Sequence, residues 1–126
     1  MSASRAIRGK VLWFALALPG AWEDHPWGES VAKVGKKVFV FLGLDHHEAD
    51  PPEFAMTAKL DESHEHALAV PGAAPTGYGL GKSGWVTVPL RAISPPVDVL
   101  NNWVEESYRL IAPKRLVGEL DAHRPA

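Results

Sequence analysis

Two strand-like runs on either side of Gly35-Lys36 constrain the fold of this chain more than any other feature. The runs are residues 29–34 (ESVAKV) and residues 37–44 (KVFVFLGL). Both contain valine or phenylalanine at several positions, and a short connection that includes glycine is typical of an antiparallel β-hairpin. The chain therefore has to build an antiparallel sheet, and its remaining elements must extend that sheet or pack against it.

Further strands and helices follow from the hydrophobic pattern. Residues 54–60 (FAMTAKL) and 85–90 (WVTVPL) predict two more strands. Helical spacing predicts helices over about residues 4–18 and 62–70, a long helix that stops before Pro113, and a short one within KRLVGEL. The order helix, three strands, helix, strand, helix predicts an α+β fold, with an antiparallel β-sheet and helices packed on it.

Particular residues are expected at the helix ends and in the core. Asp61 is placed to cap the helix over 62–70. Ser94 is placed to cap the long helix, with Pro95 in its first turn, where no amide donor is needed. Trp103 is expected in the core because of its size. One stripe of the long helix is expected to point inward: Val97, Leu100, Val104, Ser107, Tyr108 and Ile111.

Length and composition limit the class of protein. A chain of 126 residues suits one domain, residues 1–126. It has no cysteine, which excludes disulfides and thiolate metal sites and is compatible with the reducing cytoplasm, where we expect the protein. The apolar run VLWFALAL follows Arg5, Arg8 and Lys10 and fits either a signal segment or an amphipathic helix. We favour the helix, and the run is too short to span a bilayer, so no membrane segment is expected.

The charge of the chain is small and unevenly distributed. A net charge of −2 argues against a strong non-specific nucleic-acid binder. Residues 44–66 carry seven acids against the single base Lys59, and the rest of the chain carries twelve bases against eight acids, a net +4. A modest basic face is therefore compatible with this sequence, and the acidic middle segment is a candidate surface for a protein partner.

The stretch PGAWEDHPWGE, residues 19–29, follows neither a helical nor a strand pattern. We interpret it as a corner between the first helix and the first strand: Pro19-Gly20 end the helix and Gly28 allows the turn. Trp22 and Trp27 would then anchor the corner to the core. The alternative is the lip of a pocket, formed by Trp22, Glu23, His25 and Trp27.

Other candidate chemistry has simpler explanations. GLGKSG over residues 79–84 matches a dinucleotide-binding pattern, but a strand follows it where the motif requires a helix. His46 and His47 with neighbouring acids, joined by His64 and His66, would suit zinc or nickel, but we favour a solvated acidic loop. His25 is a general-base candidate with no nucleophile close in sequence. We expect no metal, no cofactor and no enzymatic activity.

Four segments together carry a resemblance to a known family. They are LPGAWEDHPWGE, KVGKKVFVFL, GYGLGKSGWVTVPL and VEESYRLIAPKRL, in this order, from about Leu18 to Leu116. In these segments the chain resembles the YjbR/MmcQ family of small bacterial proteins. The resemblance implies a CyaY-like α+β sheet fold and a proposed DNA-binding role for a "double wing" arrangement.

The resemblance suggests where nucleic acid would bind. Lysines cluster on the first hairpin, another lies beside a tryptophan in the glycine-rich loop, and two basic residues follow the long helix. The candidates are Lys33, Lys36, Lys37, Lys82, Trp85, Lys114 and Arg115. Such residues contact phosphates and stack on bases. Three hypotheses remain open. The first is a DNA-binding or regulatory protein that is not an enzyme, and the second is a module that binds a protein or small ligand on its sheet face. An enzyme that uses Glu23, Asp24 and His25 is the third.

Overall fold

The computed structural model describes residues 3–46, 53–77, 79–91 and 95–123, and the side chains of Trp27 and of residues 44–46 lie outside that description. The α-helices in this part of the chain are α1 (Ala3–Leu16), α2 (His64–Leu68), α3 (Val97–Ile111) and α4 (Lys114–Ala122). The strands are β1 (Ala21–Asp24), β2 (Ser30–Val34), β3 (Lys37–Leu42), β4 (Leu44–His46), β5 (Glu53–Lys59), β6 (Ala74–Pro75) and β7 (Trp85–Leu90). Two short 3₁₀ helices are η1 (Pro26–Gly28) and η2 (Leu80–Ser83).

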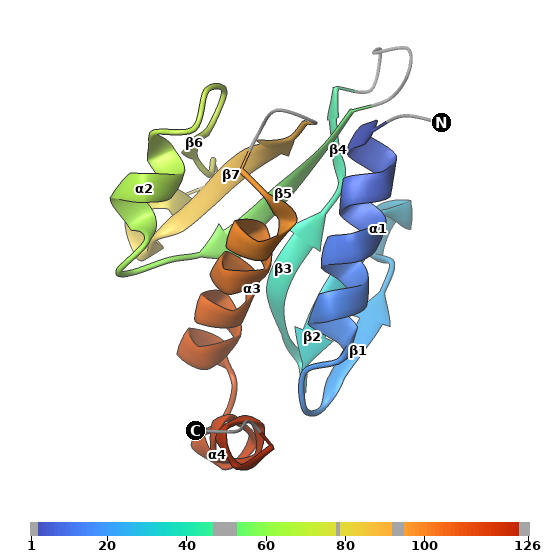
Figure 1. Ribbon diagram of the computed structural model, residues 1–126, viewed down its shortest axis with the longest axis vertical. Coiled ribbons are helices and arrows are strands. Elements are labelled where there is room, and N and C mark those ends of the chain that lie inside the picture. Colours follow the sequence, from blue (N-terminus) through green and yellow to red (C-terminus); the bar gives the residue numbers. More distant parts are fainter. Residues whose placement is uncertain (1–2, 47–52, 78, 92–94, 124–126) are drawn as a thin grey trace.

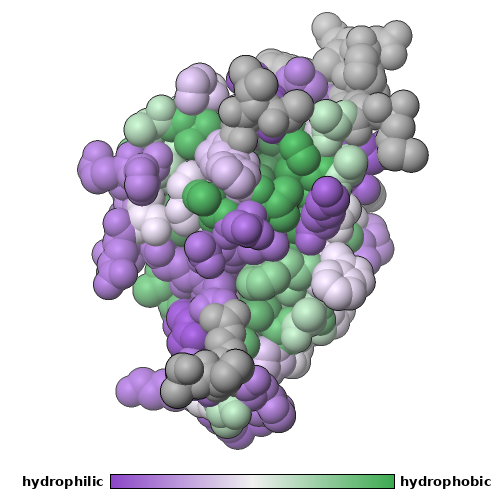
Figure 2. All heavy atoms as spheres, viewed as in Figure 1, coloured by the Kyte–Doolittle hydropathy of each residue, from purple (hydrophilic) through white to green (hydrophobic). Residues whose placement is uncertain are grey.

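The strands form one antiparallel sheet in the order β1-β2-β3-β5-β7-β6. β4 follows β3 after Gly43 and also pairs with β5, so β3 and β4 together line most of that strand. The helices α1 and α3 lie across one face of the sheet, and α2 lies beside β7 (Figure 1). On this face polar residues gather over the helices, and hydrophobic residues show between them (Figure 2). The predicted α+β fold is confirmed.

The alternation of side chains along each strand explains why the helices pack where they do. In β5, Phe54, Met56 and Ala58 are buried in the core, whereas Thr57 and Lys59 are half-buried on the opposite face. β7 alternates in the same way, as its sequence predicts. The helical stripe of α3 completes the core with Leu100, Trp103, Val104, Ser107 and Tyr108. The face opposite α1 and α3 therefore carries polar residues of the strands, together with the rings of Phe41 and Trp85.

One polar side chain in this core joins α3 to the sheet. The hydroxyl of Ser107 is fully buried; it donates a hydrogen bond to the carbonyl oxygen of Phe39 at 2.6 Å and accepts one from the amide of Lys59 at 3.0 Å. Phe39 is the extra residue of a β-bulge, because Ala32 pairs with Val40 while its neighbour in β2 pairs with Val38. Ser107 thus satisfies two backbone groups at the point where the bulge interrupts the sheet.

The next residue of α3 fixes the start of the sheet. The ring of Tyr108 meets that of Phe39 edge to face, with centroids 5.3 Å apart, and its hydroxyl donates to the carbonyl oxygen of Pro19 at 2.5 Å. Burial, with a smaller contribution from Glu119, raises the pKa of Tyr108, so the phenol remains a donor in the physiological range. Tyr108 therefore ties the turn between α1 and β1 to the core.

Most predicted elements are present. The hairpin over residues 29–44, the strands at 54–60 and 85–90, the helices at both ends and the core position of Trp103 are confirmed. The prediction that residues 19–29 contain no strand is wrong, because AWED forms the edge strand β1 against β2. The short strands β4 and β6 were not predicted either. All three are short, so an alternating pattern has no room to develop in them.

Two predicted helix caps are wrong. α2 begins at His64, and the amides of Asp61 and Ser63 donate instead to the carboxylate of Glu106 in α3, at 2.7 and 3.2 Å. A tertiary contact thus replaces the local cap. α3 begins at Val97 with Pro96 at its N-cap, so Pro95 precedes the helix rather than lying in its first turn. Ser94 lies outside the described residues.

The Ser107 bridge predicts a specific loss of stability. Ser107→Ala leaves a buried carbonyl and a part-buried amide without a partner, and each such group costs about 1–3 kcal/mol. We expect the free energy of unfolding to fall by about 2–4 kcal/mol in urea denaturation followed by circular dichroism. Ser83→Ala, which changes an exposed serine of η2, is the matched control and should shift stability by less than about 0.5 kcal/mol. Equal stability of the two variants would contradict the bridge.

Candidate nucleic-acid interface

The antiparallel topology brings separate basic segments to one end of the sheet. The turn between β2 and β3, the last residue of β5 and the first residue of β7 lie at this end, because neighbouring strands run in opposite directions. Lys59 of β5 is paired directly with Trp85 of β7. Lys36 lies in the turn, Lys37 opens β3, and Lys82 lies in η2 just before β7. We call this region the basic end of the sheet.

A cavity of about 390 Å³ opens at the basic end. Its lining combines aromatic and aliphatic side chains with two lysines: Lys37, Val38, Phe41, Lys59, Leu80, Trp85, Leu110 and Ile111. The ring of Trp85 meets that of Phe41 edge to face, with centroids 5.7 Å apart and an angle of 67° between the planes. The cavity thus offers an aromatic wall and two cationic groups to one ligand. We call it the basic cavity.

The basic cavity lies where β3 and β5 separate. The paired register between these strands covers Val40–Ala58 and Phe41–Thr57 and ends there. One step further, Ser107 takes the place of the bond that would join Phe39 to Lys59. In Figure 1 the two strands diverge toward this end, and α3 lies across the opening. The bulge and the serine therefore leave room on the opposite face, and the last turn of α3 supplies Leu110 and Ile111 to the cavity.

The lysines of the basic end have no anionic partner among the described residues. Lys36, Lys37 and Lys82 are exposed, and Lys59 is half-buried. No acid lines the basic cavity itself. Lys114 and Arg115 are exposed in the first turn of α4, which begins three residues after Ile111. The structure therefore brings the predicted contacts Lys36, Lys37, Lys82 and Trp85 to one end of the sheet. Lys114 and Arg115 follow the last turn of α3, which lines the basic cavity.

An acidic cavity of about 360 Å³ lies beside the basic one and shares Leu110 with it. Its lining includes Asp61, Glu62, Glu105 and Glu106 together with Arg109. Arg109 donates to Asp121 at 2.6 Å and to Glu105 at 3.0 Å, and these two hydrogen bonds raise its pKa. The acidic cavity limits the basic surface on the side of α3, so an anionic ligand can extend from the basic cavity only over the sheet.

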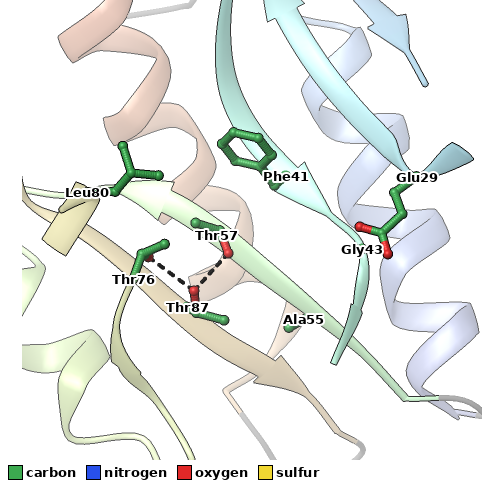
Figure 3. A pocket seen from close by; sticks show the side chains of 8 residues that line it. All are labelled: Glu29, Phe41, Gly43, Ala55, Thr57, Thr76, Leu80 and Thr87. Atoms are coloured by element: carbon green, nitrogen blue, oxygen red, sulfur yellow. Dashed lines mark hydrogen bonds between the residues drawn. The ribbon is translucent and has the colours of Figure 1, made fainter. Parts of the chain in front are cut away.

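A second cavity of about 390 Å³ lies on the sheet face opposite α1 and α3 (Figure 3). It shares Phe41 and Leu80 with the basic cavity. Its base is a chain of three hydroxyls: Thr87 lies 2.9 Å from Thr57 and 3.1 Å from Thr76, oxygen to oxygen. Three hydroxyls that bond only to one another use two of their three protons, so one donor remains for a ligand or for the backbone. We call this the threonine cavity.

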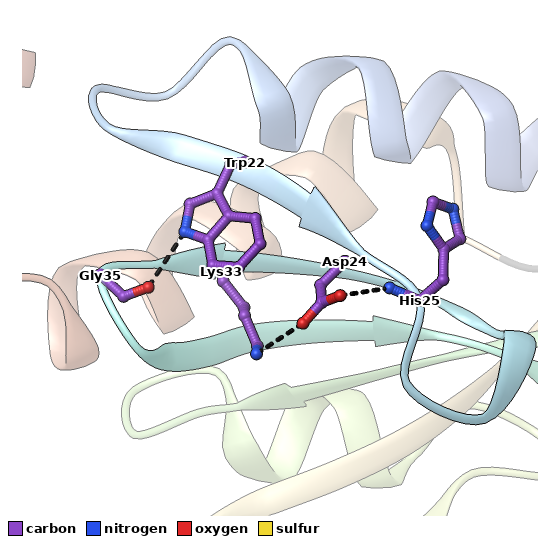
Figure 4. A network of polar contacts seen from close by, with 5 residues as sticks. All are labelled: Trp22, Asp24, His25, Lys33 and Gly35. Carbon is purple, nitrogen blue, oxygen red and sulfur yellow. Dashed lines mark hydrogen bonds and ion pairs between the residues drawn. The ribbon is translucent and has the colours of Figure 1, made fainter.

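Lys33 does not join the basic end as a free cation. Its Nζ lies 2.7 Å from the carboxylate of Asp24 and 5.2 Å from the ring centroid of Trp22 (Figure 4). Trp22 is 45% exposed, and its indole nitrogen donates to the carbonyl oxygen of Gly35 at 3.0 Å. The prediction that Trp22 anchors the corner to the core is therefore wrong. It pairs with Lys33 across β1 and β2, on the face away from the helices.

The predicted pocket lip at residues 22–27 is not assembled as one site. Glu23 pairs with Ala32, a core residue, and Asp24 pairs with Val31, so the two acids point to opposite faces of β1. Glu23 accepts a hydrogen bond from Ser30 and lies 2.9 Å from His25. The carboxylate thus stands between serine and histidine, whereas a catalytic triad requires histidine to contact the serine. The side chain of Trp27 lies outside the described part of the structure.

The remaining motifs take structural roles in the described residues. In the GLGKSG stretch, Gly84 has φ 92°, and a Cβ there would lie 2.7 Å from the carbonyl oxygen of Leu60; β7 follows directly, as the sequence predicts. Gly28, with φ 82°, makes the predicted turn. No three metal-ligating side chains cluster within the described segments, and His47 lies outside them. Nor is any helix there long and apolar enough to cross a membrane.

Sequence reasoning missed several residues that line the basic cavity, above all Phe41 and Lys59. Strand alternation carries part of the signal, because Lys59 shares a face with Thr57, the polar face of an otherwise apolar strand. The bulge at Phe39 puts Phe41 on that face as well, and no local pattern reveals the bulge. Leu80, Leu110 and Ile111 reach the cavity only through tertiary packing.

Fold and site together define an α+β protein with helices on one face of an antiparallel sheet, and with ligand-sized cavities on the other face and at one end of the sheet. The YjbR family model matches residues 16–110 of this chain. The match covers the sheet and most of α3, so the chain belongs to the YjbR family. None of the curated proteins matches the sequence.

The ion pair between Asp24 and Lys33 can be measured by titration. Hydrogen bonds from Lys33, and next from the amide of His25, lower the pKa of Asp24 below its ordinary value of 3.8. A lowered pKa in the folded state adds stability above that ordinary value and loses it as the pH falls. We expect Lys33→Met to raise the pKa of Asp24 in carbon-detected NMR titration and Lys37→Met to leave it unchanged. An identical Asp24 titration in Lys33→Met would contradict the pair.

Proposed function

We propose that this protein is a cytoplasmic nucleic-acid-binding protein without enzymatic activity, and that the basic end of its sheet contacts DNA. The observation that carries the proposal is the convergence of four lysines from three separate segments at the end of the sheet that carries Trp85: Lys36 and Lys37, Lys59, and Lys82. None of these lysines has an ion-pair partner among the described residues. Unpaired lysines beside the half-buried rings of Trp85 and Phe41 suit a ligand that combines phosphates with flat rings.

The electrostatics favour weak, salt-sensitive binding. Each phosphate neutralised on duplex DNA releases a counterion, and four contacts give a log–log salt slope of about −3.6. The acidic cavity beside α3 restricts how far a duplex can extend over the protein. We therefore expect a modest affinity for DNA that depends on the salt concentration.

The arrangement around His25 supports a function without catalysis. Its imidazole Nε2 lies 2.9 Å from the carboxylate of Glu23, and Glu23 also takes the hydrogen bond of Ser30. A nucleophilic serine needs its proton removed by a base such as histidine, and here the hydroxyl is directed to a carboxylate. This supports a structural role for the corner at residues 19–29.

A second candidate function is binding of a small ligand on the sheet face. It is favoured by the threonine cavity, which adjoins the basic cavity through Phe41 and Leu80 and has a volume typical of small-molecule sites. Such a ligand would have to be anionic near Lys37 and polar near Thr87. A melting-temperature shift with a small anion, lost in Thr87→Val and absent with DNA, would favour this function.

The nucleic-acid proposal predicts a defined salt dependence. Fluorescence anisotropy with a labelled DNA duplex should show micromolar binding at low salt, with a log–log slope of about −3.6. The double variant Lys36→Gln/Lys37→Gln should reduce the magnitude of the slope by about 1.8, because two phosphate contacts are lost. The loss of affinity in the double variant should be largest at low salt and should shrink as salt rises, because the two slopes differ.

The control removes one lysine charge elsewhere, against two in the double variant. Lys10 is exposed on α1, on the helical face of the sheet, so Lys10→Gln should leave both slope and affinity unchanged. Equal effects of Lys10→Gln and the double variant would show attraction by overall charge rather than by the basic end. Flat titrations with both duplex and single strands, even at low salt, would refute the proposal.

A further inference from the structure

We infer that the ligand of the basic cavity is a single-stranded nucleic acid, with one unstacked base seated against Trp85 and its phosphates held by Lys37 and Lys59. This inference rests on the proposed function and specifies its substrate class. Three observations lead to it: the shape of the cavity, the placement of its charges, and the acidic surface beside it.

The cavity suits a base that has left a duplex. A volume of about 390 Å³ bounded by Trp85, Leu80 and Val38 is concave and largely apolar, with only two cationic groups. In a duplex the faces of the bases are stacked and only their edges reach the grooves. Stacking on an aromatic side chain requires an exposed face, which a single strand offers at every position.

The hairpins at the basic end do not have the form of groove-reading elements. The turn between β2 and β3 has only the two residues Gly35 and Lys36, so this hairpin remains within the sheet. The loop that carries Lys82 folds back, since Leu80 lines both cavities on the sheet face. Lysines placed around the basic cavity suit a nucleic-acid strand whose phosphate backbone bends toward the cavity.

The acidic cavity argues against a duplex at the same place. It adjoins the basic cavity at Leu110 and carries Asp61, Glu62 and Glu106, besides Glu105, which is paired with Arg109. Duplex DNA is stiff over a persistence length of about 50 nm, so a duplex seated on the basic cavity would pass its phosphates over these acids. A single strand is flexible enough to turn away from them and cross the sheet.

The threonine cavity gives the seated base a polar neighbour. Thr87 and Trp85 lie on the same face of β7, two residues apart, a separation of about 7 Å. The hydroxyl chain of Thr57, Thr76 and Thr87 therefore lies within reach of a ring stacked on Trp85. Hydroxyls both donate and accept hydrogen bonds, so they can pair with the edge of any base. This suits recognition that does not depend on a strict nucleotide sequence.

The test compares four fluorescent or competing probes by anisotropy at constant salt: a twelve-nucleotide thymidine strand, the same strand with abasic sites, a duplex of equal length, and thymidine monophosphate. We expect the single strand to bind at least about tenfold more tightly than either the abasic strand or the duplex. Trp85→Leu should weaken the single strand roughly 5- to 150-fold and leave its salt slope unchanged. Trp85→Phe, which keeps a flat ring, should restore most of the affinity.

The control and the opposing outcomes are distinct. Trp13 is 79% exposed on α1, so Trp13→Leu should not change binding, and circular dichroism melting confirms that each variant is folded. Equal, salt-sensitive binding of single strand and duplex, unaffected by Trp85→Leu, would overturn this inference and leave the proposed function standing. If only thymidine monophosphate bound tightly, the inference would be overturned, and the ligand of the basic cavity would be a free nucleotide rather than a strand. Absence of binding by every probe would refute both the inference and the proposed function.

Discussion

The buried hydroxyl of Ser107 holds together the part of the sheet on which the candidate site is built. It donates to the carbonyl oxygen of Phe39 and accepts from the amide of Lys59. It therefore replaces one backbone hydrogen bond between β3 and β5. A buried carbonyl without a partner is costly, so the strands can separate at this point only because α3 supplies the missing group. The fold thus opens its sheet at one end without losing backbone hydrogen bonds there.

This opening links the core to the surface. On the inner side the neighbouring residue Tyr108 packs on Phe39 and reaches Pro19, which secures the first turn of the chain. On the outer side the same separation leaves the basic cavity between Lys37 and Lys59. The position of α3 therefore sets both the start of the sheet and the width of the cavity.

The sequence predicted those parts of the fold that depend on local pattern. The hairpin around Gly35, the alternating strand over 85–90 and the amphipathic α3 are confirmed because each extends over enough residues to show its period. The edge strand β1 and the capping of α2 by Glu106 were not predictable in this way. β1 owes its strand conformation to pairing with β2, and the cap comes from a residue more than forty positions away in the chain.

The same distinction holds for the site, and it shows why net charge was a poor guide. Lys36, Lys37, Lys82 and Trp85 were candidates from the sequence, whereas Lys59 lies in the acidic middle segment and was counted only against it. In the fold several acids are engaged: Asp24 with Lys33, and Glu105 and Asp121 with Arg109. Charges act over a Debye length of about 10 Å at 0.1 M salt. The potential at the basic cavity is therefore set by the unpaired lysines around it and by the acids beyond Leu110, not by the sum of −2 over the chain.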